Sequence, residues 1–465
     1  MMRSAKLLFL AALASFVLAA FCSVENPDIY YYMGCVRLLL DGKIPFLDFN
    51  IAYTPLSFYM ASLPASIFGT GNTAALAYNF FLAFVNAGLL YYLLRKNVQD
   101  KALCLFSTAY YLISIFFLDG TCYMLEPYVM FWGLLSLIVQ RRDNLPAMFV
   151  AGICSFMAFW SKQYGLGFIA LNIAFLLLQW ARRTEQGAWA KASRMFALLT
   201  GFTIAACCMI GLLLMHGATP LSSLHAFSGE TYQKLGLIGL LEGYGFLIIA
   251  FPFFPVTVWL IAKNFSHFRK ETFMVVCLCG IFGFMLSTYV RSYMHYIQLA
   301  MPFAILLSAM LLDKYCQQAA DCRLVRWYKF TVIVPLAIML YFDCNFIFHS
   351  ERRAVNRTAS EVARIIPKGT DKVYVSTMLL CIGNINRYGA PMIEKWGMSN
   401  GFMEEGEPLR EIIMDASCFV IDPAKLEYLR QEEPELLRHI EVGRIQTRIE
   451  CSDKRFETIV FSNQE

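Results

Sequence analysis

Long apolar segments separated by short polar connections make up most of the first 349 residues. A helix that crosses a membrane needs roughly 20 mostly apolar residues, and eleven segments have this character. They cover residues 7–22, 74–94, 102–118, 127–139, 146–160, 165–181, 195–215, 244–262, 273–290, 296–312 and 330–348. The pattern predicts a mostly α-helical, polytopic membrane protein with about 11 transmembrane helices.

The connection between the first two segments, residues 23–73, is too apolar for a solvated loop and is interrupted by prolines. Asn26 and Pro27 are typical of a helix start, and we expect this helix to end at Asp41-Gly42. A second amphipathic helix is expected over residues 55–68. Because amphipathic helices of this kind lie along a membrane surface, both helices are predicted to be interfacial.

Residues 350–465 alternate short apolar runs with polar helical patterns. We expect helices at 355–366 and from Asp422-Pro423 to Arg430, and strands at 372–376, 417–421, 442–449 and 456–461. A segment of this length can bury a core of its own. The chain is therefore predicted to consist of a transmembrane domain, 1–349, and a small C-terminal α/β or α+β domain, 350–465.

Composition supports this division. Hydrophobic residues make up 58% of the chain and charged residues only 16%, whereas soluble proteins carry roughly 25% charged residues. An ordinary soluble enzyme is therefore excluded. The net charge of +5 divides into +8 for residues 1–349 and −3 for the remainder, which gives no indication of a nucleic-acid partner.

Lysine and arginine are distributed unequally between alternate connections. With the N-terminus in the cytoplasm, the inner connections carry 18 basic residues and the outer ones before residue 350 carry only 5, which are Arg37, Lys43, Lys162, Lys234 and Arg291. This asymmetry follows the positive-inside rule. It predicts a cytoplasmic N-terminus, a first outer loop at residues 23–73 and an extracytoplasmic C-terminal domain. The first apolar segment is expected to be a retained anchor rather than a cleaved signal peptide.

Most of the fifteen cysteines lie in or beside apolar segments, where cysteine behaves as a small hydrophobic residue. Cys381, Cys418 and Cys451 lie in the polar C-terminal region. If that region is extracytoplasmic, one pair of the three could form a disulfide, and the sequence does not identify the pair.

Acidic residues near membrane segments are costly, so they indicate where chemistry is concentrated. Asp28 begins the predicted helix after the first span, where it either acts in catalysis or simply stabilises the helix N-terminus. Asp48 lies in a loop and is either a functional residue or a turn residue. Glu126, at the outer end of a span, needs a partner or water and is either a site residue or an interfacial helix cap.

The first outer loop resembles that of GT-C fold glycosyltransferases, specifically the protein mannosyltransferase and aminoarabinose transferase group. The resemblance rests on Asn-Pro-Asp-Ile-Tyr-Tyr at 26–31, Leu-Leu-Leu-Asp-Gly-Lys-Ile-Pro-Phe-Leu-Asp-Phe at 38–49 and Tyr-Thr-Pro-Leu-Ser-Phe-Tyr at 53–59. Leu-Glu-Pro at 125–127, Trp-Ser-Lys-Gln-Tyr-Gly at 160–165 and Tyr-Met-His-Tyr at 293–296 agree with it. The order of these motifs is more specific than any one of them.

The resemblance implies transfer of a sugar from a polyprenyl-phosphate carrier on the outer side of the membrane, with the first-loop aspartate, Asp28, as the catalytic carboxylate. A hydroxyl group is a poor nucleophile until a base takes its proton, which fits this role. The implied substrates are a polyprenyl-phosphate-linked sugar and a glycan, lipid or protein acceptor. Inversion at the anomeric carbon is also implied. In such a site, Asp48 is a candidate for orienting the acceptor and Glu126 for positioning the sugar or the acceptor.

A lipid-phosphate leaving group needs a cation near the outer interface. Lys162, Arg291 and His295 lie at outer span ends and are the candidates, although each is also explained by snorkelling to headgroups or by an ordinary polar contact. Tyr293 and Tyr296 are interpreted as aromatic-belt residues rather than site groups. No cofactor is assigned, and a divalent cation held by Asp28, Asp48 or Glu126 stays an open alternative.

Two other functions remain open at this stage. A polytopic transporter or flippase for a lipid-linked substrate would have the same composition, but its ionisable groups usually lie near the membrane midplane. The second alternative function is that of a non-catalytic assembly factor with an outer binding domain. The short loops and the resemblance favour a location in a bacterial inner membrane.

Overall fold

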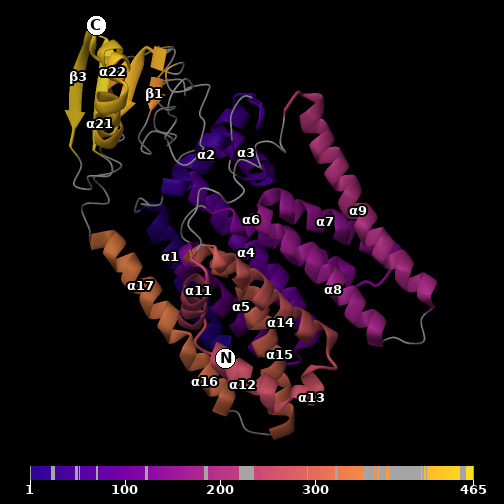
Figure 1. The fold of residues 1–465 in the computed structure, drawn as a ribbon. Coiled ribbons are helices and arrows are strands. Elements are labelled where there is room, and N and C mark those ends of the chain that lie inside the picture. Colours follow the sequence, from indigo (N-terminus) through magenta and orange to yellow (C-terminus); the bar gives the residue numbers. More distant parts are fainter. Residues whose placement is uncertain are drawn as a thin grey trace. The chain divides into compact units, whose positions relative to one another are not determined.

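A computed structural model describes residues 2–21, 27–47, 51, 53–69, 72–120, 124–182, 187–218, 235–290, 292–319, 323–348, 361–362, 364–366, 373–375, 410, 413–414, 416–450 and 457–463 (Figure 1). The chain forms two compact units. Unit 1 comprises Met1–Val17, Asn79–Leu212 and Tyr232–Asp343, and unit 2 comprises Leu18–Tyr78, Leu213–Thr231 and Cys344–Glu465.

Helices account for almost all of the first 348 residues that the structure describes. They are α1 (Met2–Phe21), α2 (Pro27–Leu40), α3 (Leu56–Phe68), α4 (Asn72–Asn97), α5 (Lys101–Ile115), η1 (Phe116–Gly120), α6 (Glu126–Gln140), α7 (Leu145–Ser161), η2 (Gln163–Gly165), α8 (Leu166–Arg182), α9 (Ala188–Met215), α11 (Leu237–Ala250), α12 (Phe254–Lys263), α13 (Phe265–Phe268), α14 (Thr272–Met285), η3 (Leu286–Tyr289), η4 (Met294–Leu299), α15 (Met301–Ala319), α16 (Arg323–Thr331) and α17 (Ile333–Phe348). The predicted helical class is confirmed.

Six described helices are long and apolar enough to cross a membrane, and a seventh is added if one bent pair counts as a single span. The six are Ala77–Asn97, Lys101–Leu118, Gln163–Arg182, Ala188–Met215, Thr272–Tyr289 and Arg323–Tyr341. The other predicted segments form helices that are shorter, bent or only partly described. The chain is therefore a multi-pass membrane protein.

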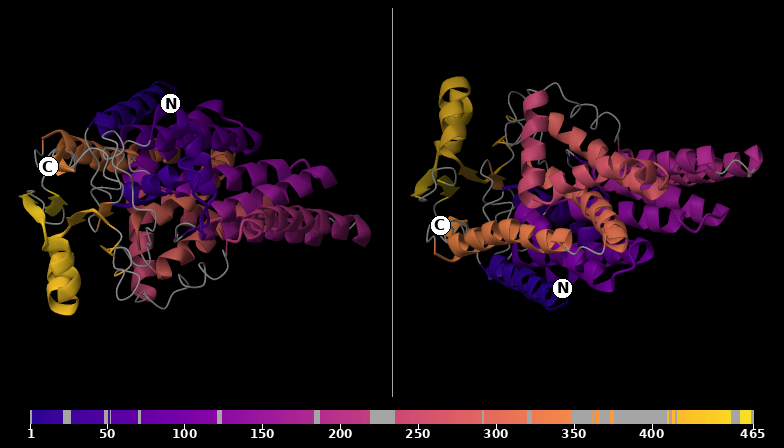
Figure 2. Two further views of the ribbon diagram at one scale, coloured as in Figure 1. Left: turned by 90° about the horizontal axis from the view of Figure 1, so that it is seen from above. Right: turned by 90° about the horizontal axis from the view of Figure 1, so that it is seen from below.

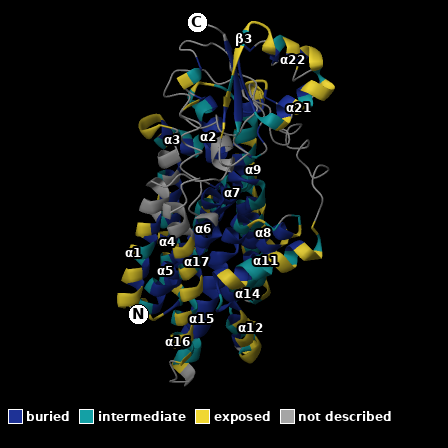
Figure 3. Cartoon of the chain, turned by 90° about the vertical axis from the view of Figure 1, so that its left-hand side faces the viewer, coloured by how far each residue is buried: buried dark blue, intermediate teal, exposed yellow. Residues whose placement is uncertain are grey.

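The core of unit 1 is built from α5, α14 and α15, whose residues are mostly buried in Figure 3. Along α15, Ala304, Ile305, Leu306 and Leu307 are all fully buried. Helices α7, α8 and α9 lie side by side as magenta ribbons in both views of Figure 2, and residues such as Leu198 join them in a second apolar cluster. Much of the α9 surface is exposed and apolar, as expected for a helix that faces lipid.

The predicted single span at residues 244–262 is wrong in one respect. The segment breaks at Phe251–Phe253, and α11 and α12 are bent by 96° there. Pro252 has no N–H and cannot continue the helix. The Phe254 N–H donates to the Phe251 carbonyl, and the carbonyl of Ala250 accepts a hydrogen bond from Ser114 Oγ at 2.8 Å instead. The rings of Phe251 and Phe253 pack against Tyr328, so the bend is filled by aromatic side chains.

Hydrogen bonds bring the predicted inner connections together at one end of unit 1. Arg182 Nη1 donates to Thr272 Oγ1 at 2.6 Å, which joins the ends of α8 and α14. Arg141 Nη2 donates to Asn97 Oδ1 at 2.9 Å, which joins the end of α4 to the residue after α6. Four of the connections that the charge pattern assigned to one side of the membrane are thus joined in pairs.

In unit 2, the two helices predicted within residues 23–73 have bounds within one residue of those expected. Helix α2 begins at Pro27 and ends at Leu40, and α3 ends at Phe68, followed by Gly69. Tyr32 of α2 is only 1% exposed, and its ring packs against the rings of Tyr53 and Phe58 at 5.7 and 6.0 Å between centroids. Some apolar residues of these helices therefore pack the two helices on each other, whereas Leu63, Ile67 and Phe68 of α3 are exposed, and the interfacial location stays a prediction.

The C-terminal region contains a four-stranded sheet with order β1-β2-β4-β3. The strands are β1 (Val373–Val375), β2 (Cys418–Ile421), β3 (Arg444–Ile449) and β4 (Thr458–Asn463). Strand β2 pairs parallel with β1 and antiparallel with β4. Asp422 caps α21 (Pro423–Glu432) by accepting from the backbone N–H of Lys425, and α21 and α22 (Pro434–Glu441) pack on the sheet through a core that includes Leu429 and Ile440. The predicted mixed α/β character is confirmed.

Cys418 is a free, buried thiol in this sheet, whereas Cys381 and Cys451 lie outside the described residues. Burial raises the pKa of the Cys418 thiol to about 11. Because the thiolate is the reactive form, we expect Cys418 to resist iodoacetamide at pH 8 in the folded protein and to react once the chain is unfolded in dodecyl sulfate. Peptide mass spectrometry measures both states, and equal labelling in the two would contradict this prediction.

Candidate functional site

Glu126 is the first residue of α6, where the helix leaves the connection after η1. Its position is fixed locally by Pro127, which suits the first turn of a helix, and by a tether to α4. Asn86 Nδ2 of α4 donates to the Pro127 carbonyl at 2.8 Å, and this amide is buried. A carboxylate at a helix N-terminus is also favoured by the helix dipole.

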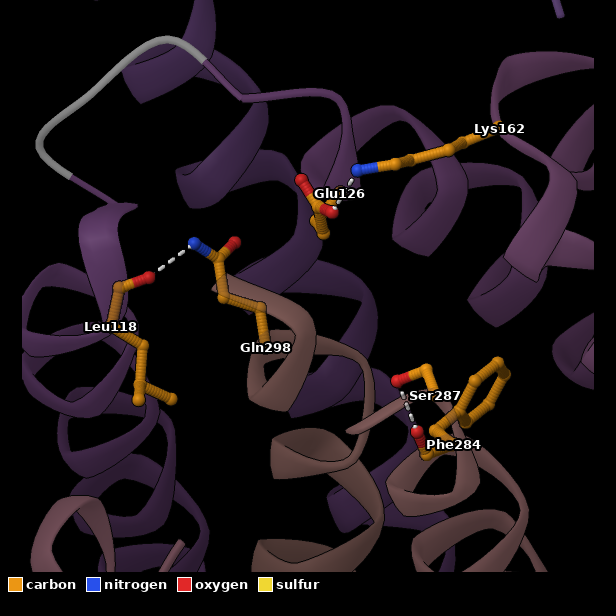
Figure 4. Close-up of polar contacts among 6 residues, drawn as sticks. All are labelled: Leu118, Glu126, Lys162, Phe284, Ser287 and Gln298. Atoms are coloured by element: carbon orange, nitrogen blue, oxygen red, sulfur yellow. Dashed lines mark hydrogen bonds and ion pairs between the residues drawn. The ribbon is translucent and has the colours of Figure 1, made fainter. Parts of the chain in front are cut away.

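Lys162 lies in the tight turn between α7 and α8. Its own backbone is extended, with φ −164° and ψ 145°, and η2 follows it directly. Gly165 allows this turn because a Cβ atom there would lie 2.0 Å from the carbonyl oxygen of Ala158. The turn directs the Lys162 side chain back toward α6 (Figure 4).

Gly165→Ala is expected to destabilise the protein by about 2–3 kcal/mol, since the added methyl group overlaps backbone rather than a movable side chain. The measurement is the thermal unfolding midpoint of purified protein in detergent. Gly88→Ala is the matched control, because a Cβ at Gly88 in α4 meets nothing within 4 Å. Equal midpoints for the two variants would contradict the proposed role of the turn.

Lys162 and Glu126 form a buried ion pair. Lys162 Nζ donates to Glu126 Oε1 at 2.6 Å, and the two side chains are 1% and 0% exposed (Figure 4). Among the residues that the structure describes, none donates a hydrogen bond to the other carboxylate oxygen, Oε2. A buried carboxylate oxygen without a donor retains full capacity to accept one.

Aromatic and imidazole rings surround this ion pair. Lys162 Nζ lies 5.0 Å from the centroid of the Tyr296 ring and 5.7 Å from that of Tyr164. His295 stacks edge-on against Tyr296 at 4.6 Å, is 8% exposed, and lies within electrostatic range of the Glu126 carboxylate. Four elements, α6, the α7–α8 turn, η2 and η4, thus converge on one polar cluster.

The sequence interpretation of Tyr296 as an aromatic-belt residue is wrong. Its side chain is only 7% exposed and lies against Lys162 and His295. Tyr293 is 45% exposed, as an interfacial aromatic would be. Tyr293 directly precedes η4, and its ring stacks on that of His295 at 5.4 Å between centroids. A one-dimensional pattern cannot separate these two tyrosines, because their exposure depends on contacts with residues of other elements.

Gln298 is a buried polar residue that the sequence analysis did not single out. Its Nε2 donates to the carbonyl oxygen of Leu118 at 2.5 Å (Figure 4). Leu118 lies in η1, a short π-helical turn, and such turns leave carbonyls without their usual helical partner. Ser287 Oγ likewise donates to the carbonyl of Phe284 at 2.7 Å, close to the same end of the unit. The Gln298–Leu118 bond joins η4 to η1, the turn that precedes Glu126 in the chain, whereas the Ser287 bond is local to the end of α14.

The remaining predicted site residues are not placed against this cluster. Asp28 is the second residue of α2, and its side chain is outside the described part of the structure. Asp48 and Arg291 also lie outside the described residues. Within the described ranges, no three His, Cys, Asp or Glu side chains gather so that they could hold a metal ion.

Comparison with solved structures identifies the architecture. The chain superposes on the crystal structure of ArnT from Cupriavidus metallidurans bound to undecaprenyl phosphate with a TM-score of 0.67, 13% identity and 99% coverage of both chains. The apo form of the same protein gives a TM-score of 0.66. The chain has the GT-C fold.

A second GT-C protein supports the assignment. The oligosaccharyltransferase AglB from Archaeoglobus fulgidus, in complex with an inhibitory peptide and a dolichol-phosphate, gives a TM-score of 0.51 at 11% identity, with 98% of this chain and 74% of that chain covered. No protein-family model and no curated protein sequence matches the chain. The resemblance expected from the motifs at residues 26–59 is therefore confirmed at the level of the fold.

Proposed function

We propose that this GT-C protein is a membrane glycosyltransferase that moves a sugar from a polyprenyl-phosphate donor to an acceptor on the outer side of the membrane. The observation that carries the proposal is the fold shared over 99% of both chains with a protein whose structure contains undecaprenyl phosphate. A helix that begins at Pro27-Asp28, as the first-loop motif predicts, supports it. A glycan, a lipid or a protein is the acceptor.

Asp28 is the proposed catalytic base. The acceptor hydroxyl oxygen attacks the anomeric carbon, and the Asp28 carboxylate takes the hydroxyl proton as the new C–O bond forms. The bond from the anomeric carbon to the phosphate oxygen breaks, and its electron pair leaves with the lipid phosphate. The negative carboxylate also favours the oxocarbenium-like charge that develops on the sugar. This single displacement inverts the anomeric configuration.

The Glu126 cluster is proposed to position the sugar or the acceptor and to offset the leaving phosphate. Glu126 Oε2 can accept a hydrogen bond from a sugar hydroxyl, whereas Oε1 holds Lys162. Because the Lys162 ammonium group already donates to Glu126, it binds the lipid phosphate by donating to the carboxylate and the phosphate at once. His295 can donate to the same phosphate, with Arg291 as a further cation and Asp48 as an orienting residue.

The topology that goes with this function places the N-terminus in the cytoplasm, residues 350–465 outside as an extracytoplasmic domain, and the transmembrane domain at residues 1–349. The uneven distribution of 18 and 5 basic residues supports this orientation. A bacterial inner membrane, with an undecaprenyl carrier, is the proposed location.

The bend between α11 and α12 does not favour the alternative of a transporter. Broken helices in transporters expose helix ends and carbonyls to a polar substrate site. Here the break is filled by Phe251, Phe253 and Tyr328, and the Ala250 carbonyl is already paired with Ser114. The break is therefore a bend filled by packed side chains and not an open polar substrate site.

The test uses the purified full-length protein in lipid vesicles supplied with undecaprenyl-phosphate-linked aminoarabinose, mannose or glucose and with glycolipid, polysaccharide or peptide acceptors. Mass spectrometry measures released undecaprenyl phosphate and glycosylated product. We expect acceptor-dependent consumption of at least one donor. Donor movement between leaflets without any consumption would instead identify a flippase and overturn the proposal.

A further inference from the structure

A second polar site lies at the other end of unit 1 from the Glu126 cluster. A cavity of about 630 Å³ opens between the end of α4, the start of α14 and the last turns of α15. In α15, twelve residues separate Met301, just after η4, from Asp313 on the cavity wall, which is about 18 Å of helix. The cavity is therefore separate from the proposed transfer site.

The shape of the cavity is fixed by Asp313. Its side chain is 8% exposed and accepts hydrogen bonds from the backbone N–H groups of Gln99 and Asp100 at 2.9 and 3.3 Å. Gln317 Nε2 donates to the same carboxylate at 3.0 Å. The α4–α5 connection is thus held against α15, and the Asp313 charge is balanced by amide donors rather than by a lysine or an arginine.

Three cationic side chains line the cavity, namely Arg95, Lys96 and Lys314. Arg95 Nη1 donates to the carbonyls of Val98 and Gln99, which fixes its position. Lys96 is exposed and lies over the Tyr92 ring at 5.6 Å, with no hydrogen bond or ion pair to the described residues. Its charge is therefore available to a ligand.

The remaining acid of the cavity competes weakly for these cations. Glu271 Oε1 lies 3.8 Å from Lys314 Nζ, and the two side chains are 47% and 42% exposed. An exposed ion pair at this distance contributes less than about 1 kcal/mol. Replacing the Glu271 carboxylate by a ligand anion at Lys314 therefore costs little free energy, because a phosphate group offers several acceptor oxygens to the two lysines.

We propose that this cavity binds the phosphate group of an anionic phospholipid. Phe273, Met274 and Met310 provide an apolar wall beside the cationic one, as an amphiphile requires. The cavity also lies at the ends of α4 and α14, which are long and apolar enough to cross a membrane, so we expect lipid headgroups to reach it. Basic pockets between such helices on the cytoplasmic side bind anionic headgroups in other membrane proteins, and the charge asymmetry assigns this end to the cytoplasm. A soluble metabolite that carries a phosphate group would offer the same chemistry to this cavity.

The test is native mass spectrometry of the full-length protein in detergent, titrated separately with phosphatidylglycerol, phosphatidylcholine and inorganic phosphate. Lys96→Gln with Lys314→Gln removes the two lysine charges of the cavity. Lys101→Gln with Lys263→Gln is the matched control, since it removes two lysines of the same predicted inner side that do not line the cavity. We expect one phosphatidylglycerol per chain and a roughly thirtyfold loss of its affinity in the cavity variant only.

Each outcome decides the proposal. Binding of inorganic phosphate alone, lost in the cavity variant, keeps the phosphate site and assigns it to a soluble ligand. Equal losses in both double variants would show nonspecific attraction to a basic surface and overturn the site. Binding of phosphatidylcholine as tight as that of phosphatidylglycerol would overturn it as well. Because none of these measurements depends on sugar transfer, the result is independent of the proposed function.

Discussion

Asp28→Asn is expected to lower sugar transfer by roughly 10²- to 10⁴-fold, because the acceptor hydroxyl loses the base that takes its proton. The substitution is nearly isosteric and removes only a charge. As the second residue of α2, Asp28 also interacts with the helix dipole, and losing that interaction costs about 0.3–1 kcal/mol. The variant should therefore remain folded, and turnover per folded molecule separates catalysis from helix stabilisation.

The matched control for this prediction is Asp41→Asn, in the same loop. Asp41 forms only a half-exposed ion pair with Arg37 at 3.2 Å. Turnover of this variant should stay close to that of the unmodified protein. If Asp28→Asn lowers the amount of folded protein but not its specific activity, the carboxylate only stabilises the helix, and the assigned catalytic role fails.

Removing one partner of the buried Glu126–Lys162 pair is expected to have the largest effect on stability. Glu126→Gln or Lys162→Met leaves one charge buried without its partner, which costs about 3–5 kcal/mol in comparable buried pairs. The double variant removes both charges and should recover a large part of this loss. Thermal unfolding midpoints of the four proteins in detergent give the coupling between the two residues.

Glu427→Gln provides the corresponding surface control. Glu427 pairs with Arg430 within α21, both side chains are at least half exposed, and such a pair contributes at most about 1 kcal/mol. Additive effects of the two single variants at Glu126 and Lys162 would mean that the pair is not energetically coupled. Recovery of stability without recovery of sugar transfer in the double variant would support a role of the pair in positioning substrate.

Local patterns predicted those elements whose ends depend on neighbouring residues. Helix α2 begins at Pro27, because proline suits a first turn, and ends at Leu40, directly before Asp41-Gly42. Strand β2 is a buried run that stops at Asp422, whose side chain caps the next helix. In each case the determining interaction lies within a few residues of the chain.

The bend in the predicted span at 244–262 illustrates what local patterns leave open. Both halves are apolar, so hydropathy continues through Pro252 without interruption. The bend depends on Ser114 and Tyr328, which are far away in the sequence and fill the space at the break. A hydropathy profile contains no information about such partners.

By itself, the sequence determined that this is a multi-pass helical membrane protein with a mixed C-terminal region, and its first-loop motifs indicated the GT-C fold. These features follow from hydropathy, proline positions and short motifs, which act locally. Only the tertiary structure decided that Glu126 pairs with Lys162, that Tyr296 lies against both Lys162 and His295, and that Asp313 shapes a cavity at the opposite end. Such contacts join residues from different helices, and they depend on how the helices pack rather than on any pattern along the chain.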